Sequence, residues 1–360
     1  MSHFINFLKI ENFKSIKSVQ IDCEKINLFI GRPNTGKSNI LEALSLISHT
    51  ESVGKIFDGL IYFNSIEDIF RDNDTSLDIS IESNIGSAKL KYFNSEKTYG
   101  LLCDFTGRNT FSELDECDSM GDAIHLLDDW AQSPFESKSG NTGFRAVEFK
   151  SNGIVTTGNN NFSSNIRRYS YRRISKHDNT FVGFLHPPLG DNLLRIFDSH
   201  HKLFDEAALL FSEYGLDLVT VENEKKIVLQ KKIGRRAYQL PYSLAADTLQ
   251  RIIFHLAAIH SNQNSILLFE EPEAHAFPPY VQQLAEAIAA DESNQFFIAT
   301  HSPYILDTLM NQKNSVAVFL VDYIDYQTTI RQLTQDDIDG VLRYHTNIFF
   351  NLDKFKQAES

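Results

Sequence analysis

The sequence predicts an α/β fold of P-loop NTPase type, with a mostly parallel core sheet and an additional antiparallel β subdomain. The apolar run 26–30 (INLFI) precedes the loop 31–39 (GRPNTGKSN), and the amphipathic stretch 40–48 follows it. Strand, glycine-rich loop and helix in this order are the elements of a phosphate-binding loop. Beyond Pro241 apolar runs alternate with helical patterns, which is typical of a parallel sheet covered by helices.

The first half of the chain contains mainly strand patterns. Residues 4–10 and 17–23 alternate apolar and polar side chains, which predicts two strands joined by a turn. Short alternating segments between 55 and 104, separated by Asn, Asp, Ser and Gly, predict antiparallel strands. The stretch 105–192 has one helical pattern at 120–132 within Ser-, Gly- and Asn-rich sequence, so we expect an inserted, partly helical lobe there.

The second half begins with a helical pattern over 193–214, which ends at Gly215. The segments 216–222 and 226–233 then predict a hairpin. The remaining elements are expected to be a helix, strand, helix, strand and helix, in this order, at 243–260, 265–269, 279–290, 295–300 and 303–310.

The charge, the cysteines and the N-terminus indicate the cellular compartment and limit the partners that the protein can bind. The 360 residues carry a formal net charge of −13, so any nucleic-acid contact requires a local basic patch. Cys23, Cys103 and Cys117 lack the spacing of a zinc site or a disulfide framework, which indicates a reducing compartment. The N-terminus does not resemble a signal peptide, and no apolar run approaches the roughly 18 residues that span a bilayer. We therefore expect a cytoplasmic protein without a membrane partner.

The loop matches the pattern GxxxxGKS and predicts binding of ATP with Mg²⁺. Its glycines allow backbone N–H groups to surround phosphates, Lys37 would reach the β and γ oxygens, and the Ser38 hydroxyl would be a magnesium ligand. The candidate nucleotide-binding residues of the loop are Gly31, Arg32, Pro33, Asn34, Thr35, Gly36, Lys37, Ser38 and Asn39.

Acidic side chains follow the apolar strand 266–269, which we expect beside the P-loop strand. Glu270 and Glu271 would stand at its carboxyl end, where α/β sheets bind ligands. Glu270 would hold Mg²⁺, through water, and Glu271 would polarise the attacking water. Taken alone, the pair also fits a solvated strand end.

The second apolar strand, in NQFFIATHSPYIL, ends in Thr300, His301 and Ser302. A histidine at this end of the sheet could hydrogen-bond the γ-phosphate or the attacking water. A lone histidine is more often structural, but its place after the P-loop and the glutamates favours a catalytic role for His301.

Four stretches together resemble the ABC-type ATPase heads of the SMC and RecF group. They are KIENFKSI (9–16), GRPNTGKSNILEAL (31–44), LLFEEPEAHAFPP (267–279) and FFIATHSPYIL (296–306). The resemblance is strongest to the OLD (overcoming lysogenisation defect) branch, and it covers 4–48 and 239–309. It says little about 50–235. Together with the element patterns, it leads us to expect a first half of the head at 1–104, an inserted lobe at 105–192 and a second half at 193–360.

The resemblance further implies an ATP-sandwich dimer, in which a signature segment of one subunit closes the nucleotide of the other. That segment would be LPYSLAADTLQR (240–251), with Ser243 at a helix N-terminus facing a γ-phosphate. Ser243 equally fits a simple N-cap, and Leu244, Ala245 and Ala246 replace the usual glycines. Lys14 resembles a basic residue near the phosphates, or it is a solvated turn lysine; no Q-loop glutamine occurs in 50–75.

Other features bear on the partners. The chain has no heptads for an SMC coiled coil, and we expect no Toprim nuclease after His301. The cluster of Arg167, Arg168, Arg172 and Arg173, with interleaved tyrosines, would contact nucleic acid or an acidic partner, or stay solvated. The basic stretch 225–236 is expected to be a hairpin with solvent-facing lysines.

We therefore expect an ATP-hydrolysing ABC/OLD-like ATPase that forms a homodimer or higher homo-oligomer around ATP. It would control a separately encoded effector such as a nuclease, in bacterial anti-phage defence. The alternatives are a RecF-like ATP-gated DNA clamp and a nucleotide-gated scaffold with very slow turnover.

Overall fold

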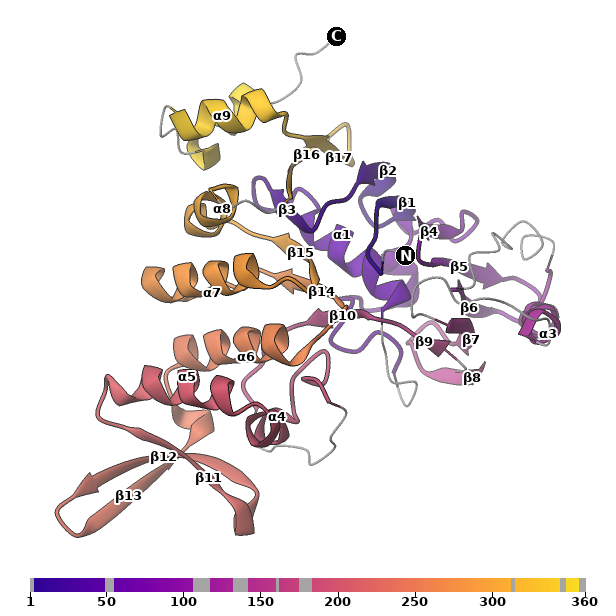
Figure 1. Cartoon of the computed structure of the whole chain (residues 1–360). Coiled ribbons are helices and arrows are strands. Elements are labelled where there is room, and N and C mark those ends of the chain that lie inside the picture. The colour runs from indigo at the N-terminus through magenta and orange to yellow at the C-terminus, as the bar shows by residue number, and fades with distance from the viewer. Residues whose placement is uncertain are drawn as a thin grey trace.

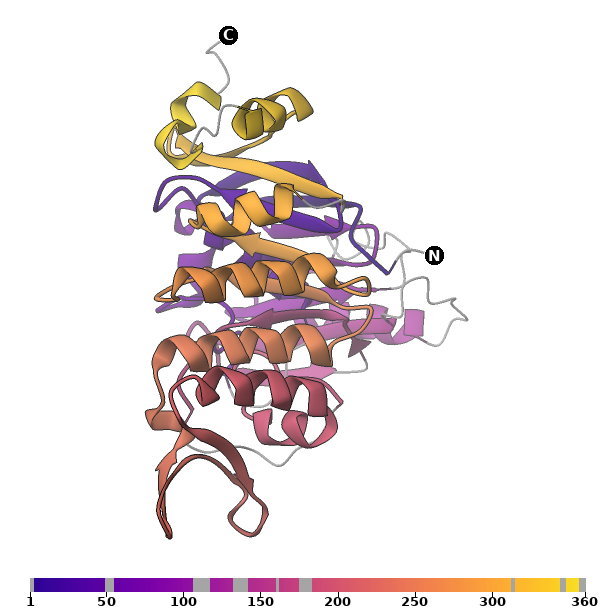
Figure 2. The same cartoon turned by 60° about the vertical axis from the view of Figure 1, so that its left-hand side comes forward.

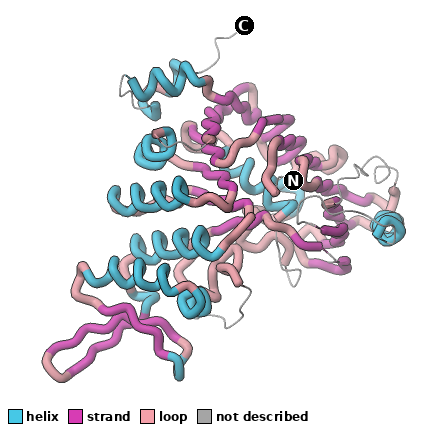
Figure 3. The backbone as a smooth tube through the Cα atoms, in the orientation of Figure 1, coloured by secondary structure: helices cyan, strands magenta, loops and turns pink. Residues whose placement is uncertain are grey.

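The structure, a computed structural model, describes residues 3–48, 55–105, 117–131, 142–159, 162–174, 183–311, 315–343 and 348–355. Figure 1 shows the elements, and Figure 3 separates helices, strands and loops. The parallel and antiparallel sheets with their helices confirm the predicted α/β P-loop ATPase fold. Among the described residues, no helix combines the length and the apolar content that crossing a bilayer requires.

A six-stranded sheet carries the nucleotide-binding elements. Its order is β10 (Ile166–Tyr169), β14 (Ile266–Glu270), β15 (Gln295–Ala299), β3 (Ile26–Ile30), β16 (Val316–Ile324) and β17 (Gln327–Gln332). All neighbours are parallel except β16 and β17, which form an antiparallel hairpin. The carboxyl ends of β14, β15 and β3 therefore meet at one edge of the sheet.

Both faces of this sheet are buried, which explains its continuous apolar strands. In β14, Leu267 and Phe269 face a core with the helices, whereas Ile266 and Leu268 face a second core with α1 (Lys37–Leu44) and the antiparallel strands. The helix layer consists of α6 (Asp247–Ser261), α7 (Pro278–Ala290) and α8 (Pro303–Met310), which lie side by side in Figure 2.

The antiparallel sheet packs on the side of α1 that faces away from the six-stranded sheet (Figure 1). Its strands, in spatial order, are β2 (Ile16–Asp22), β1 (Phe7–Phe13), β4 (Ile79–Ser83), β5 (Ser87–Phe93), β6 (Thr98–Asp104), β7 (Thr142–Phe149) and β8 (Val155–Asn159), and β9 (Phe162–Ser163) also pairs with β7. The expected boundary at residue 104 falls between β6 and β7, which pair with each other, and the division into domains remains a prediction.

A three-stranded antiparallel sheet projects from the helix layer (Figures 1 and 3). It contains β11 (Asp217–Val221), β12 (Lys226–Ile233) and β13 (Arg236–Pro241). The predicted hairpin is present, and β13 extends it. The structure also has α3 (Met120–Ala131), α9 (Gln335–Arg343) and the 3-10 helices Ser45–Ile47, Ile66–Ile69, Arg71–Asn73, Glu222–Glu224, Tyr242–Leu244, Ile348–Phe350 and Leu352–Phe355.

Three expectations about the elements are wrong. The strand 266–269 does not lie beside the P-loop strand, because β15 lies between them. The helix expected over 193–214 is two helices, α4 (Leu193–Ser199) and α5 (His201–Ser212), since His200 leaves the helical conformation with φ −122° and ψ 74°. The helix expected from residue 243 begins at Asp247, after a short 3-10 turn.

One buried histidine makes the stability of the fold dependent on pH. His255 in α6 is buried, its ring packs 5.1 Å from that of Phe269, and burial lowers its pKa to about 3. The folded chain therefore stays unprotonated at this residue below pH 6.5, where the unfolded chain takes up a proton. The contribution of the neutral His255 to the free energy of unfolding is therefore fully present above pH 6.5, and it is lost as the pH falls towards the pKa of about 3 in the folded chain.

We expect this histidine to reduce the free energy of unfolding by about 2 kcal/mol between pH 6.5 and pH 5. The substitution His255→Phe should remove that part of the pH dependence, as measured by urea unfolding at both pH values. His201→Gln, at an exposed position of α5, is the matched control. Parallel pH profiles for the wild type and His255→Phe would contradict the assignment.

Candidate functional site

The phosphate-binding loop occupies residues 31–36, between β3 and α1. Gly36 caps the helix with φ 97°, a left-handed conformation that favours glycine. A Cβ at this position would lie 2.1 Å from the Thr328 Oγ1 atom of β17. The loop therefore requires glycine here both for its backbone angle and for the close approach of β17.

Lys37 points back into the loop. Its ammonium group donates to the carbonyl oxygens of Gly31 (3.3 Å) and Arg32 (2.7 Å), and the residue is only 5% exposed. Burial lowers the pKa of Lys37, while Glu271 and Glu270 act in the opposite direction. Phosphate oxygens entering the loop would offer this cation stronger, charged acceptors than the two carbonyls.

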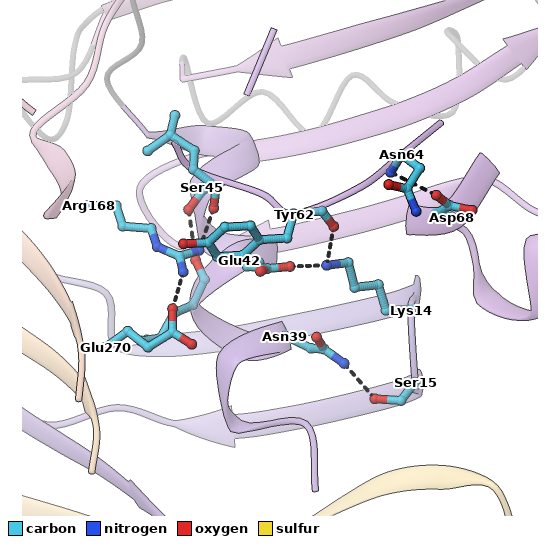
Figure 4. A network of polar contacts seen from close by, with 12 residues as sticks. Lys14, Ser15, Asn39, Glu42, Ser45, Tyr62, Asn64, Asp68, Arg168 and Glu270 are labelled. Carbon is cyan, nitrogen blue, oxygen red and sulfur yellow. Dashed lines mark hydrogen bonds and ion pairs between the residues drawn. The ribbon is translucent and has the colours of Figure 1, made fainter. Parts of the chain in front are cut away.

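Hydroxyl groups from distant segments hold the loop in place. Thr328 Oγ1 donates to the carbonyl oxygen of Thr35 at 3.0 Å and lies 2.6 Å from Ser15 Oγ. The amide of Asn39 in α1 donates to the same serine oxygen at 2.7 Å (Figure 4). The β1–β2 turn and β17 therefore fix the loop geometry before any ligand binds.

The loop, the second glutamate and the histidine share one cavity of about 530 Å³. The lining residues include Pro33, Asn34, Thr35, Gly36, Lys37, Ser38, Asn39, Ser15, Glu271, His301 and Tyr323. Three segments that are far apart in the sequence thus converge at the carboxyl ends of β3, β14 and β15. Because loop residues 33–36 and the Lys37 ammonium border the cavity, the residues fit a nucleotide phosphate chain.

Glu271 leaves the strand direction directly after β14. Its φ is 42°, and its N–H donates to the carbonyl oxygen of Ala299 in β15 at 2.8 Å. A left-handed glutamate costs about 1 to 2 kcal/mol, and here it turns the carboxylate into the cavity. Its Oε1 atom lies 3.6 Å from His301 Nε2, and half of the side chain is exposed.

The surroundings of His301 favour its neutral form. Burial and then the neighbouring Lys37 ammonium lower the pKa of His301, and Glu271 only partly opposes them. A neutral imidazole offers one donor and one acceptor nitrogen, which suits contact with a phosphate oxygen or a water.

Glu270 and Lys14 do not line this cavity. Glu270 is ion-paired with Arg168 of β10, and Lys14 is ion-paired with the buried Glu42 of α1 (Figure 4). Lys14 instead lines a neighbouring cavity of about 690 Å³, which shares Ser15 and Tyr323 with the first. Direct ligation of magnesium by Glu270 therefore requires its carboxylate to turn away from Arg168, whereas the expected contact through water does not.

Oxygen donors suitable for Mg²⁺ are nevertheless present in the cavity. The Ser38 hydroxyl and the Glu271 carboxylate line it, and hard oxygen ligands are the ones this ion prefers. Glu270 is the nearest further carboxylate along the chain. These residues fit a nucleotide-bound magnesium ion.

Glu273 was not predicted as a site residue. It connects the loop after β14, which carries Glu271, to the loop after β15, which carries His301. Its Oε1 atom accepts hydrogen bonds from Thr300 Oγ1 at 2.7 Å and from the His301 N–H at 2.8 Å. Burial raises the pKa of Glu273. The available signal was the third acid of EEPE, two residues after Glu271.

We expect Glu273→Ala to lower the kcat for ATP about tenfold with little change in KM, because the bonds from the His301 N–H and from the neighbouring Thr300 hydroxyl are lost and His301 is no longer held in place. Glu273→Gln keeps an acceptor oxygen at the same place and should retain most of the activity. Steady-state ATP turnover of both variants tests this. Equal losses in the two variants, or a loss confined to KM, would count against a positioning role.

Two arginines of the predicted basic cluster are wholly or partly buried. Arg168 is buried, and the half-buried Arg167 donates to Ser265 Oγ at 3.0 Å and stacks on the Phe184 ring at 3.4 Å. The expectation that Arg168 contacts nucleic acid is wrong, because β10 joins the core sheet and the guanidinium is paired there with Glu270. The same expectation for Arg167 remains a prediction. Arg172 and Arg173 are exposed.

Ser243 lies in the 3-10 helix Tyr242–Leu244 and not at the N-terminus of α6, where Ala246 is the N-cap residue. It does not line the cavity of its own chain. Its contact with a partner's nucleotide remains a prediction.

Comparison with known families adds an independent observation. Residues 4–186, slightly more than half of the chain, match the family described as AAA ATPase domain. The chain belongs to this AAA ATPase family. Residues 220–307 of the AAA ATPase match a second family, described as AAA domain, putative AbiEii toxin, Type IV TA system. The first match includes the P-loop, and the second includes Glu270, Glu271 and His301.

The AAA ATPase is also similar to the DNA replication and repair protein RecF of Oenococcus oeni. The two are 28% identical over 251 residues, which are 68% of this chain and 59% of the relative. The chain thus spans about three-fifths of the length of that relative.

Among solved structures, SMC heads are similar to this AAA ATPase. An SMC head bound to the C-winged helix domain of ScpA is 15% identical, with a TM-score of 0.46 over 92% of this chain and 99% of that chain. The SMC head domain from Thermotoga maritima is 13% identical, with a TM-score of 0.39 over 93% of this chain and 100% of that chain.

Proposed function

We propose that this chain is an ATP-hydrolysing ATPase of the SMC/RecF type, closest to the OLD branch. The observation that carries the proposal is the shared cavity, which gathers Lys37, Ser38, Glu271 and His301 from three distant segments. A phosphate-binding loop alone would support binding. A carboxylate and a neutral histidine opposite it supply what hydrolysis additionally requires.

Each side chain has a distinct part in the proposed reaction. Lys37 and the N–H groups of the loop bind and orient the β- and γ-phosphates. Glu271 accepts the proton of the attacking water, and the neutral His301 hydrogen-bonds the γ-phosphate or that water. Bound Mg²⁺ would neutralise phosphate charge, with Ser38 and Glu270 as its protein ligands.

ATP binding would bring two copies together, with Ser243 of each copy facing the nucleotide of the other. The dimer would control a separately encoded effector, such as a nuclease, in bacterial anti-phage defence. Sedimentation velocity with ATP and Mg²⁺ tests dimerisation: a shift to dimer mass with ATP and not with ADP supports it, and an unchanged monomer contradicts it. Phage challenge of cells with and without the neighbouring genes tests the defence role.

A RecF-like DNA-binding clamp is the second candidate, and the β12–β13 hairpin favours it. Residues 225–236 contain six cationic side chains and no acidic one, within a chain of net charge −13. All of residues 231–240 are exposed, including Tyr238, a possible stacking surface for a base. This hairpin replaces Arg168 of β10 as the candidate phosphate-binding surface, and the RecF similarity is consistent with it.

Reversing the charges at the tip tests the DNA candidate. A variant with Lys231, Lys232, Arg235 and Arg236 changed to Glu should bind DNA much more weakly, and the magnitude of the salt slope of log K should fall by roughly 3 to 4. The matched control reverses four other exposed cations, Lys97, Lys150, Arg172 and Lys202. Salt-titrated fluorescence anisotropy is the measurement. No binding by the wild type at low salt excludes this candidate.

A further inference from the structure

Arg168 connects the magnesium-ligand candidate to a backbone segment beside the site. Its guanidinium donates to the carbonyl oxygen of Leu60 at 2.5 Å and is ion-paired with the Glu270 carboxylate (Figure 4). The arginine side chain is 2% exposed and that of Glu270 is 28% exposed. A buried guanidinium that loses its carboxylate partner is strongly destabilised, so Arg168 retains Glu270 as long as nothing replaces the pair.

Lys14 likewise connects a carboxylate near the P-loop to the backbone of the same segment, residues 57–63. Its ammonium donates to the carbonyl oxygen of Tyr62 at 2.9 Å and is ion-paired with Glu42 in α1 (Figure 4). The Arg168 charge also lowers the pKa of Glu42, against a larger rise that comes from burial. Glu42 is therefore a second carboxylate within the electrostatic reach of Arg168.

The segment 57–63 is consequently held between the two elements that bind ATP. Leu60 is attached through Arg168 to Glu270 of β14, and Tyr62 is attached through Lys14 to Glu42 of the helix that follows the P-loop. Leu60 and Ile61 are buried, and their N–H groups bond to the Phe57 carbonyl oxygen at 2.9 and 3.1 Å. The segment thus has a defined packing that a change at either cation would disturb.

We infer that Arg168 is a positioning residue that stores the Glu270 carboxylate away from the nucleotide and couples its release to the packing of segment 57–63. While it is paired with Arg168, Glu270 does not line the cavity, so direct ligation of a metal there requires its carboxylate to turn away from Arg168. Binding of nucleotide with Mg²⁺ therefore takes Glu270 from Arg168 and loosens the Leu60 anchor. This inference rests on the proposed ATP site. It adds that the packing of segment 57–63 changes when that site is occupied.

Linkage makes the coupling reciprocal. If metal-nucleotide binding loosens the segment, then a variant whose segment is already loose binds the metal-nucleotide more readily, by the same factor. Coupling of this kind between two sites is typically about fivefold or more.

Hydrogen exchange by mass spectrometry tests the coupling without measuring turnover. In the wild type, ATP with Mg²⁺ should accelerate exchange of the amides in 57–63 at least about fivefold, and ATP with EDTA should not. In Arg168→Met the fast exchange should be present without nucleotide. Arg235→Met, at an exposed arginine between β12 and β13, is the matched control and should behave as the wild type does.

Nucleotide affinity gives the reciprocal measurement. Binding of a fluorescent ATP analogue should reach half-saturation at about fivefold less Mg²⁺ in Arg168→Met than in the wild type, with unchanged binding in EDTA. Arg168→Lys keeps the positive charge but lacks the planar guanidinium, so it should show a smaller shift in the same direction. This second variant keeps the test informative if Arg168→Met does not fold.

The outcomes separate the inference from the proposed function. If the wild type binds no ATP with or without Mg²⁺, the proposed function fails. If the wild type binds and hydrolyses ATP but exchange in 57–63 is the same in all states, or the Mg²⁺ requirement is unchanged in both Arg168 variants, the inference fails alone.

Discussion

Replacing Glu271 with glutamine is expected to lower ATP turnover by a factor of about 100 or more while ATP binding persists. The amide has nearly the same size as the carboxylate but cannot accept the proton of the attacking water. Glu271 is placed for this task by its φ of 42° and by the bond of its N–H to Ala299, and neither depends on the charge of the side chain. The geometry of the cavity should survive the substitution.

Single-turnover hydrolysis and sedimentation velocity together test this result. Glu271→Gln should accumulate as an ATP-bound dimer, whereas the exposed control Glu292→Gln should behave as the wild type does. Equal turnover in Glu271→Gln and the wild type would remove Glu271 from its assigned role. A wild type that binds ATP and dimerises but hydrolyses almost none would support the nucleotide-gated scaffold instead.

Replacing Gly36 with alanine should abolish ATP binding, with a loss of at least about 100-fold in affinity. The new Cβ would lie 2.1 Å from Thr328 Oγ1 and 3.0 Å from Ser15 Oγ, and the position has φ 97°. The loop must shift to relieve both the clash and the strained backbone. Its N–H groups would then no longer point at one phosphate position, and two misplaced charge-assisted bonds suffice for a loss of this size.

Gly340→Ala is the matched control, because a Cβ at that helical position meets open space. It should leave binding of a fluorescent ATP analogue unchanged and slightly favour the helix. Thr328→Ala with Gly36→Ala removes the nearest clash but not the backbone strain, so binding should recover only in part. Full affinity in the single Gly36→Ala variant would show that the loop does not hold the phosphates.

Local signals predicted most of the candidate site. The P-loop, Glu271 and His301 each follow a short apolar strand, and strand ends of a parallel sheet converge whatever the details of packing. Glycine spacing and alternating polarity are properties of neighbouring residues, so the sequence alone is sufficient to identify them. The helix 303–310 and the strand 26–30 agree with the structure to the residue.

The features that the sequence did not predict depend on contacts between distant segments. Arg168 looks like a surface arginine in RRYSYRR, and only the pairing of β10 with β14 shows that it is buried against Glu270. The order of two equally apolar strands has no local signal, which is why β15 was not expected between β14 and β3. Likewise, the helical periodicity of 193–214 continues through His200, where the backbone turns.

The central position of β15 determines how much room the reaction has. Adjacent strands lie about 4.8 Å apart, so the strand that leads to Glu271 and the strand that leads to the P-loop are separated by about 10 Å. Direct neighbours would have left no strand end between the acid and the P-loop. Because β15 lies between them, its carboxyl end carries His301 beside Glu271, with 3.6 Å between Nε2 and Oε1, and all three segments still border one cavity.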